Sequence, residues 1–116
     1  MIASGVVVYV SCQPVDFRKG AEGLAALVRE TMGADPFSGT VYVFRAKRPD
    51  RVKLMFWDGT GVVLVSKRLE DGEFRWPKIE DGALRLTAAQ LQALFEGLDW
   101  RRVHEPQRAA APVAAS

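Results

Sequence analysis

Hydrophobic residues along the chain follow first a strand-like and then a helix-like spacing. The β-branched and aromatic run VVVYV predicts a first strand over residues 6–12, buried on both faces. Apolar residues then recur every three or four positions as far as Met32, which predicts an amphipathic helix with Asp16 as its N-cap and Gly33 as its C-cap. The chain is therefore expected to begin with a strand-helix unit.

Three more apolar runs follow, at residues 41–44, 52–57 and 62–65, and each is suited to a strand. Turn sequences separate them at residues 48–50 and 58–61, and the second contains the Asp-Gly pair that favours a tight hairpin. Because short turns join strands that run in opposite directions, these runs predict a three-stranded antiparallel meander.

The last third of the chain predicts one short extended piece and one helix. Residues 74–76 are apolar and aromatic and are ended by Pro77; their place in the sheet stays open. Thr87 is an N-cap residue with Gln90 at the capping-box position, and the apolar spacing continues to about Gly97. A C-terminal helix is therefore expected over this stretch, followed by Trp100 as a core residue.

Together these elements predict an α+β fold, an antiparallel β-meander sheet with an N-terminal strand-helix unit and a C-terminal helix. A chain of 116 residues that is 48% hydrophobic can bury one core but is too short for two ordinary domains. We therefore expect residues 1–100 to form a single α+β domain. Residues 101–116 lack apolar periodicity and end in an Ala- and Pro-rich stretch, which predicts a disordered tail.

Nothing in the composition indicates a membrane or an export signal. No apolar run approaches the roughly 20 residues that span a bilayer, and the first residues lack a cationic segment ahead of an apolar one. The single cysteine, Cys12, cannot form an internal disulfide and is expected in the core. These features predict a cytoplasmic protein.

Residue sets that carry catalysis are missing from the sequence. His104, the one histidine, falls in the expected tail, and Cys12 is better suited to a core than to a nucleophile. Three acidic residues each precede a glycine, where a carboxylate ordinarily favours a turn: Asp58, Asp71 and Asp81. Three others could converge on a metal, although their spacing does not require it: Asp16, Asp50 and Glu70. We therefore predict no enzymatic activity, no cofactor and no metal.

Basic residues gather in the middle of the chain. The net charge is only +2, but residues 40–70 hold seven basic and three acidic side chains. The seven are Arg45, Lys47, Arg48, Arg51, Lys53, Lys67 and Arg68. A β-hairpin with such cations can lie against phosphates, and Trp57 among them could stack on a base. The alternative is an ordinary solvated sheet face whose cations pair with neighbouring acids, and charge alone does not choose between the two.

Five segments of the chain resemble the signature blocks of one family. They are residues 16–20 (DFRKG), 35–39 (DPFSG), 53–61 (KLMFWDGTG), 67–77 (KRLEDGEFRWP) and 90–101 (QLQALFEGLDWR). In this order and spacing they resemble the TnpB (Orf2-like) accessory protein of a bacterial insertion-sequence family that carries a separate DDE-type transposase, over about residues 5–102. Phe17 replaces a usual methionine and Phe56 a common tryptophan; both exchanges keep an apolar side chain.

From the charge pattern we expect DNA as a partner, bound through the basic hairpin to assist the transposase. The resemblance implies a role in transposition of a mobile genetic element alongside the element's transposase, but no catalytic residues. Combined with the charge pattern, it gives a set of candidate DNA-binding residues: Arg18, Lys19, Arg45, Lys47, Arg48, Lys53, Trp57, Lys67 and Arg68. The alternative function is a protein-protein adaptor that binds the transposase without DNA, through exposed aromatics such as Phe37, Phe56 or Trp76. The oligomeric state is not predicted.

Overall fold

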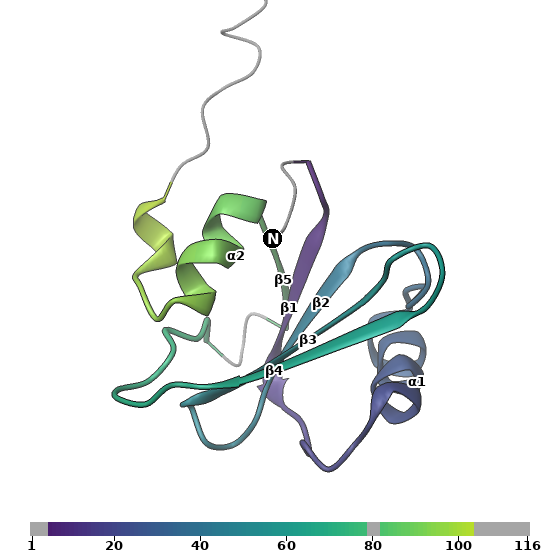
Figure 1. Cartoon of the computed structure of the whole chain (residues 1–116), viewed down its shortest axis with the longest axis horizontal. Coiled ribbons are helices and arrows are strands. Elements are labelled where there is room, and N and C mark those ends of the chain that lie inside the picture. Colours follow the sequence, from purple (N-terminus) through teal and green to yellow (C-terminus); the bar gives the residue numbers. More distant parts are fainter. Residues whose placement is uncertain (1–4, 79–81, 104–116) are drawn as a thin grey trace, which may run out of the picture.

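The computed structural model describes residues 5–78 and 82–103, which form one five-stranded sheet with helices on both faces (Figure 1). In chain order the elements are β1 (Val8–Pro14), α1 (Ala21–Met32), β2 (Val41–Arg45), β3 (Arg51–Trp57), β4 (Val62–Arg68), β5 (Ala83–Leu86), α2 (Ala88–Phe95) and a 3₁₀ turn, η2 (Trp100–Arg102). The strands lie in the order β4-β3-β2-β1-β5.

The expected meander is confirmed by β2, β3 and β4, which are consecutive in the chain and in the sheet. β2 pairs antiparallel with β3, and β3 pairs antiparallel with β4 along the full length of both. The β3–β4 turn is held by Asp58, whose Oδ1 accepts the backbone N–H groups of Thr60 and Gly61, both at 2.9 Å. Gly59 has a φ of +106°, which side chains other than glycine rarely adopt, so the Asp-Gly pair sets this turn.

The sheet as a whole is mixed, so the expectation of a purely antiparallel sheet is wrong. β1 runs parallel to β2, with Val8 opposite Val41, and α1 supplies the crossover that a parallel pair needs. β5 was not predicted; it pairs antiparallel with β1 and closes the other edge of the sheet. Residues 74–76 form no strand, but Phe74 is buried in the core beneath α2.

Helix α1 begins later than the sequence suggests. Asp16 is not its N-cap, because this carboxylate accepts the N–H of Arg18 and holds a turn before the helix. Gly20 occupies the N-cap position, and the helix starts at Ala21. Its C-cap is Gly33 with a φ of +61°, as predicted.

Helix α2 has the capping box that its sequence predicts. Thr87 Oγ1 accepts the N–H of Gln90 at 3.0 Å, and the Gln90 side chain accepts the N–H of Thr87 at 2.9 Å. Trp100 is buried against this helix and begins η2, which takes in the first two residues of the expected tail. His104 and the rest of that tail lie outside the described residues.

Two apolar clusters lie on opposite faces of the sheet, because neighbouring strand residues point to opposite sides. On the α1 face, the helix packs on side chains such as Tyr42, Phe44 and Met55. On the α2 face, Leu91 and Leu94 pack on the intervening strand residues. Cys12 is buried in the core, as expected. Within the described ranges, no helix is long and apolar enough to cross a membrane.

Candidate nucleic-acid interface

The nine predicted DNA-binding residues do not share one surface. Strand alternation places Lys53 and Arg68 on the α1 face, since they pair with Ser66 and Arg51 on that side. Arg45 and Lys67 lie on the α2 face, where each is paired with Val52.

Trp57 is separated from the predicted cations along the strand. It ends β3 at the hairpin turn, at the far end from Arg51, and its ring meets the ring of Phe37 edge-on at 5.7 Å between centroids. The aromatic expected to stack on bases therefore lies apart from the basic turn between β2 and β3.

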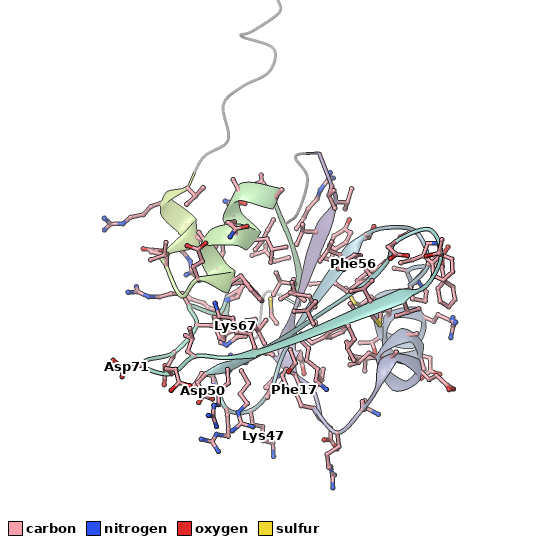
Figure 2. The ribbon with its side chains drawn as sticks, viewed as in Figure 1. Phe17, Lys47, Asp50, Phe56, Lys67 and Asp71 are labelled. Carbon is pink, nitrogen blue, oxygen red and sulfur yellow. The ribbon has the colours of Figure 1, made fainter. Side chains whose placement is uncertain are left out.

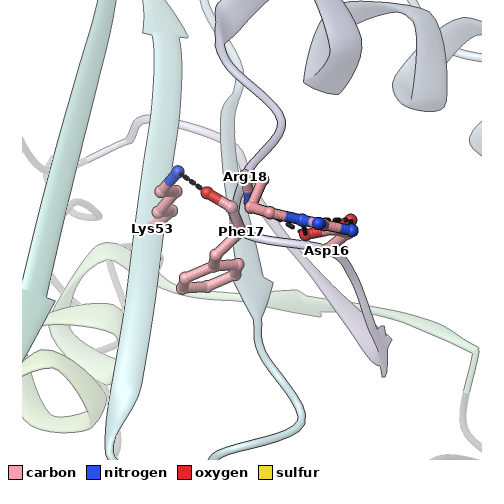
Figure 3. A network of polar contacts seen from close by, with 4 residues as sticks. All are labelled: Asp16, Phe17, Arg18 and Lys53. Carbon is pink, nitrogen blue, oxygen red and sulfur yellow. Dashed lines mark hydrogen bonds and ion pairs between the residues drawn. The ribbon is translucent and has the colours of Figure 1, made fainter.

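Lys53 is engaged in holding a loop. Its Nζ donates to the backbone oxygens of Phe17 at 2.7 Å and Lys19 at 3.3 Å, and it lies 5.1 Å from the centre of the Phe17 ring. Figure 3 shows this ammonium directed at the Phe17 carbonyl from the neighbouring strand. Lys53 thereby fixes the loop before α1 over the α1 face of the sheet.

Lys67 has the equivalent role on the other face. Its Nζ donates to the backbone oxygen of Phe95 at 2.7 Å and lies 4.5 Å from the centre of the Phe95 ring. Phe95 is the last residue of α2, and the carbonyls at a helix end have no partner within the helix. Lys67 thus ties β4 to the end of α2.

Asp16 and Arg18 form a two-point ion pair at the surface. The Arg18 Nη2 donates to Asp16 Oδ2 at 2.8 Å, and its Nε lies 3.1 Å from both carboxylate oxygens (Figure 3). Hydrogen bonds from the Arg18 side chain and backbone lower the pKa of Asp16 to about 2. The carboxylate therefore stays charged at neutral pH and keeps its ion pair with the guanidinium.

A cleft of about 410 Å³ lies between this loop and the β2–β3 turn. Residues 14–18 line one side and residues 46–48 the other, so the cleft brings Arg18 together with Lys47 and Arg48. Lys47 has no ion-pair partner within the described part of the chain and is exposed. Figure 2 shows Lys47 and Phe17 at this end of the molecule.

Two arginines are directly opposite each other at the same end of the sheet. Arg51 at the start of β3 pairs in register with Arg68 at the end of β4, on the α1 face. Like charges directly opposite each other disfavour strand pairing, and an acid beside each arginine offsets this effect. Asp50 Oδ1 is 3.8 Å from Arg51 Nε, and Glu70 is 4.0 Å from Arg68. Both Asp50 Oδ1 and Arg51 Nε are buried without a hydrogen bond.

We call this region the basic end, and it consists of Arg18, Lys19, Lys47, Arg48, Arg51 and Arg68. These cations come from three segments: the loop before α1, the β2–β3 turn with the start of β3, and the end of β4. Arg51 belongs here, although it is absent from the predicted contact set. Counting the strand register outward from the hairpin turn would have placed Arg51 opposite Arg68 and so included it in the contact set.

The acidic residues considered for metal binding have other partners. Asp16 pairs with Arg18, Asp50 lies between Arg48 and Arg51, and Glu70 is near Arg68. Over residues 5–78 and 82–103, no three His, Cys, Asp or Glu side chains are grouped to hold a metal ion. Asp58 holds the β3–β4 turn, as its position before a glycine predicts.

The aromatics considered for an adaptor surface differ in exposure. Phe37 is 44% exposed and lines a shallow pocket together with Val62, another exposed apolar residue. Phe56 and Trp76 are partly buried against the α2-face core. The Trp76 indole also donates to the backbone oxygen of Pro49 at 3.0 Å. Of the three aromatics, Phe37 is thus the most accessible to a partner.

The fold and this surface define a small α+β domain with a cationic end. The family model described as IS66 Orf2 like protein (TnpB_IS66) matches residues 6–105, and the chain belongs to this family. The chain is 48% identical over 99 residues to "Uncharacterized protein y4jC" of Sinorhizobium fredii (strain NBRC 101917 / NGR234), an alignment that covers 85% of each. It is 38% identical over 110 residues to "Uncharacterized protein y4hO" of the same strain, covering 93% of this chain and 96% of that protein. No solved structure matches the chain.

Membership of this family confirms the resemblance of the five sequence segments. It suggests an accessory role related to transposition and an association with the transposase of the element. The family is not a known catalytic one. The functional question is therefore which surface of this accessory protein binds a partner.

Proposed function

We propose that this chain is a non-catalytic accessory protein in transposition that binds DNA through its basic end and so assists the transposase. The observation that carries the proposal is the convergence of six cations from three segments on one end of the sheet, with three acids among them. A duplex presents closely spaced phosphates, and each one neutralised by a cation releases counterions and adds affinity. The acids leave this end with a net positive charge.

The Arg51–Arg68 pair adds a second argument. Arg51 and Arg68 are opposite each other in the β3–β4 register, with acids at 3.8 and 4.0 Å, so two cations lie on the same side of the sheet at this end. A phosphate that accepts from both arginines would gain charge-assisted hydrogen bonds.

The proposal assigns contact with phosphates to the basic end and a structural role to Lys53 and Lys67. Both lysines donate to backbone carbonyls inside the domain, so their ammonium groups are already engaged. Trp57 lies at the other end of β3. Since phosphates carry no base identity, the proposal predicts weak sequence preference and a steep dependence on salt.

Fluorescence polarisation with a labelled duplex from the element's end and a scrambled duplex, across a salt series, tests the proposal. The variant is Lys47→Ala with Arg48→Ala, whose side chains are exposed in a turn. The matched control is Arg75→Ala with Arg85→Ala, which removes the same charge from exposed positions elsewhere. Loss of two phosphate contacts should lower the slope of log K against log salt by about 1.8.

The control should bind as the wild type does, and both duplexes should bind with similar affinity. Equal loss of affinity in the variant and its control would show that overall charge, not the basic end, is responsible. Full affinity of the Lys47–Arg48 variant would contradict the proposal directly. Circular dichroism of both variants establishes that they are folded before binding is compared.

A further inference from the structure

Strand β4 is an edge strand whose outer side is unpaired. It lies at one end of the sheet order and pairs only with β3 among the described strands. Its seven residues, VVLVSKR, begin with four apolar residues and contain no acidic residue and no proline. Val62 is 40% exposed and Leu64 is 37% exposed. A long edge with exposed apolar side chains is a template for pairing with another strand.

The opposite edge of the sheet is better protected. β5 has only four residues, and an exposed arginine, Arg85, lies within it. Short edge strands and charged side chains are two ways in which proteins prevent edge-to-edge pairing. On β4 the charged residues, Lys67 and Arg68, are confined to one end. The structure therefore singles out β4 as the edge available for association.

The charge distribution along β4 favours an antiparallel copy of the same strand. Its C-terminal end is basic, whereas the turn at its N-terminal end contains Asp58, which is exposed and has no ion-pair partner among the residues described. Hydrogen bonds from the Thr60 and Gly61 backbones lower the pKa of this carboxyl, so it is charged at neutral pH. Two antiparallel copies would place each acidic turn toward the basic end of the other. Parallel pairing would instead bring the two basic ends together.

We propose that β4 pairs with β4 of a second copy of this chain about a two-fold axis, so that the two five-stranded sheets become continuous. With Leu64 near the axis, Leu64 faces its own counterpart and Val62 faces Ser66 on the same side of the sheet. This contact is isologous, since the same residues serve both copies. The apolar first half of β4 lies at the centre of the contact, and the proposal does not rest on DNA binding.

Sedimentation velocity of the full chain over a wide concentration range tests the proposal. The wild type should show a concentration-dependent monomer-dimer equilibrium. Leu64→Lys puts two ammonium groups near the axis and should raise the dimer dissociation constant by about tenfold or more, because each substitution enters the interface twice. The matched control is Ala83→Lys, which adds the same charge at an exposed position on β5 and should leave the equilibrium unchanged.

A second variant tests the same contact without adding a charge that could itself prevent folding. Leu64→Cys should form an intermolecular disulfide under mild oxidation, because only residues near a two-fold axis meet their own counterparts; Ala83→Cys should not. A wild type that stays monomeric at all concentrations overturns the proposal, as does a dimer that survives Leu64→Lys unchanged. If the wild type is monomeric and Leu64→Lys instead abolishes co-purification with a co-expressed transposase, the edge serves that partner and self-pairing is refuted.

Discussion

Replacing Lys67 by methionine tests whether this lysine is structural or faces DNA. Methionine keeps an unbranched apolar stem but removes the ammonium that donates to the Phe95 oxygen at 2.7 Å and lies 4.5 Å from the Phe95 ring centre. A hydrogen bond with a charged donor contributes about 1.5–3 kcal/mol, and a cation–π contact adds about 0.5–1 kcal/mol. Part of this is offset because the lysine no longer has to be desolvated. We therefore expect a loss of about 2 kcal/mol.

Urea and thermal denaturation followed by circular dichroism measure this loss. For a domain of this size, about 2 kcal/mol corresponds to a fall in Tm of about 10 °C. Arg68→Met is the matched control, because Arg68 is the next residue on β4 and its side chain is 60% exposed, with an acid no closer than 4.0 Å. The control should change stability little. Equal stability of the two variants would refute the structural role of Lys67.

Three further predictions follow from individual contacts. Lys53→Met should lower stability by about 1–2 kcal/mol, measured by urea denaturation, because its ammonium loses the Phe17 oxygen at 2.7 Å; unchanged stability would contradict this. Thr87→Ala removes half of the α2 capping box and should lower the unfolding free energy by about 1 kcal/mol, whereas Thr87→Ser should restore it. The Asp16 carboxyl should titrate near pH 2 by NMR, and Arg18→Ala should return its midpoint toward 3.8. Since the folded pKa is lowered, the stabilisation from this pair is present above about pH 4 and is lost as the pH falls through about 2; an unchanged midpoint in Arg18→Ala would count against the pairing.

Local sequence patterns predict the helices and the central meander because their causes are local. The Asp-Gly turn and the Thr87–Gln90 capping box are each determined by residues within a few positions of one another. β5 has no such local signal: it is only four residues long and is stabilised by pairing with β1, more than 70 residues earlier in the chain. The parallel β1–β2 pair likewise depends on how α1 packs, not on the sequence of either strand.

The candidate interface was predictable in composition but not in arrangement. Sequence identifies the cations, yet strand register decides which of them share a face. Lys67 and Arg68 are adjacent in sequence, but they point to opposite sides of the sheet. Whether a lysine is free or engaged depends on distant groups as well: the carbonyl that Lys67 contacts belongs to Phe95, 28 residues later in the chain.

The most direct test of the central claim is a chemical-shift map of the ¹⁵N-labelled protein during titration with a short duplex at low salt. Binding through the basic end predicts shifts that cluster at residues 14–19, 46–51 and 66–68 and reverse when salt is added. The amide signals of α2 and β5 should not shift. Shifts confined to the α2 face, or none at a saturating duplex concentration, would contradict DNA binding through the basic end.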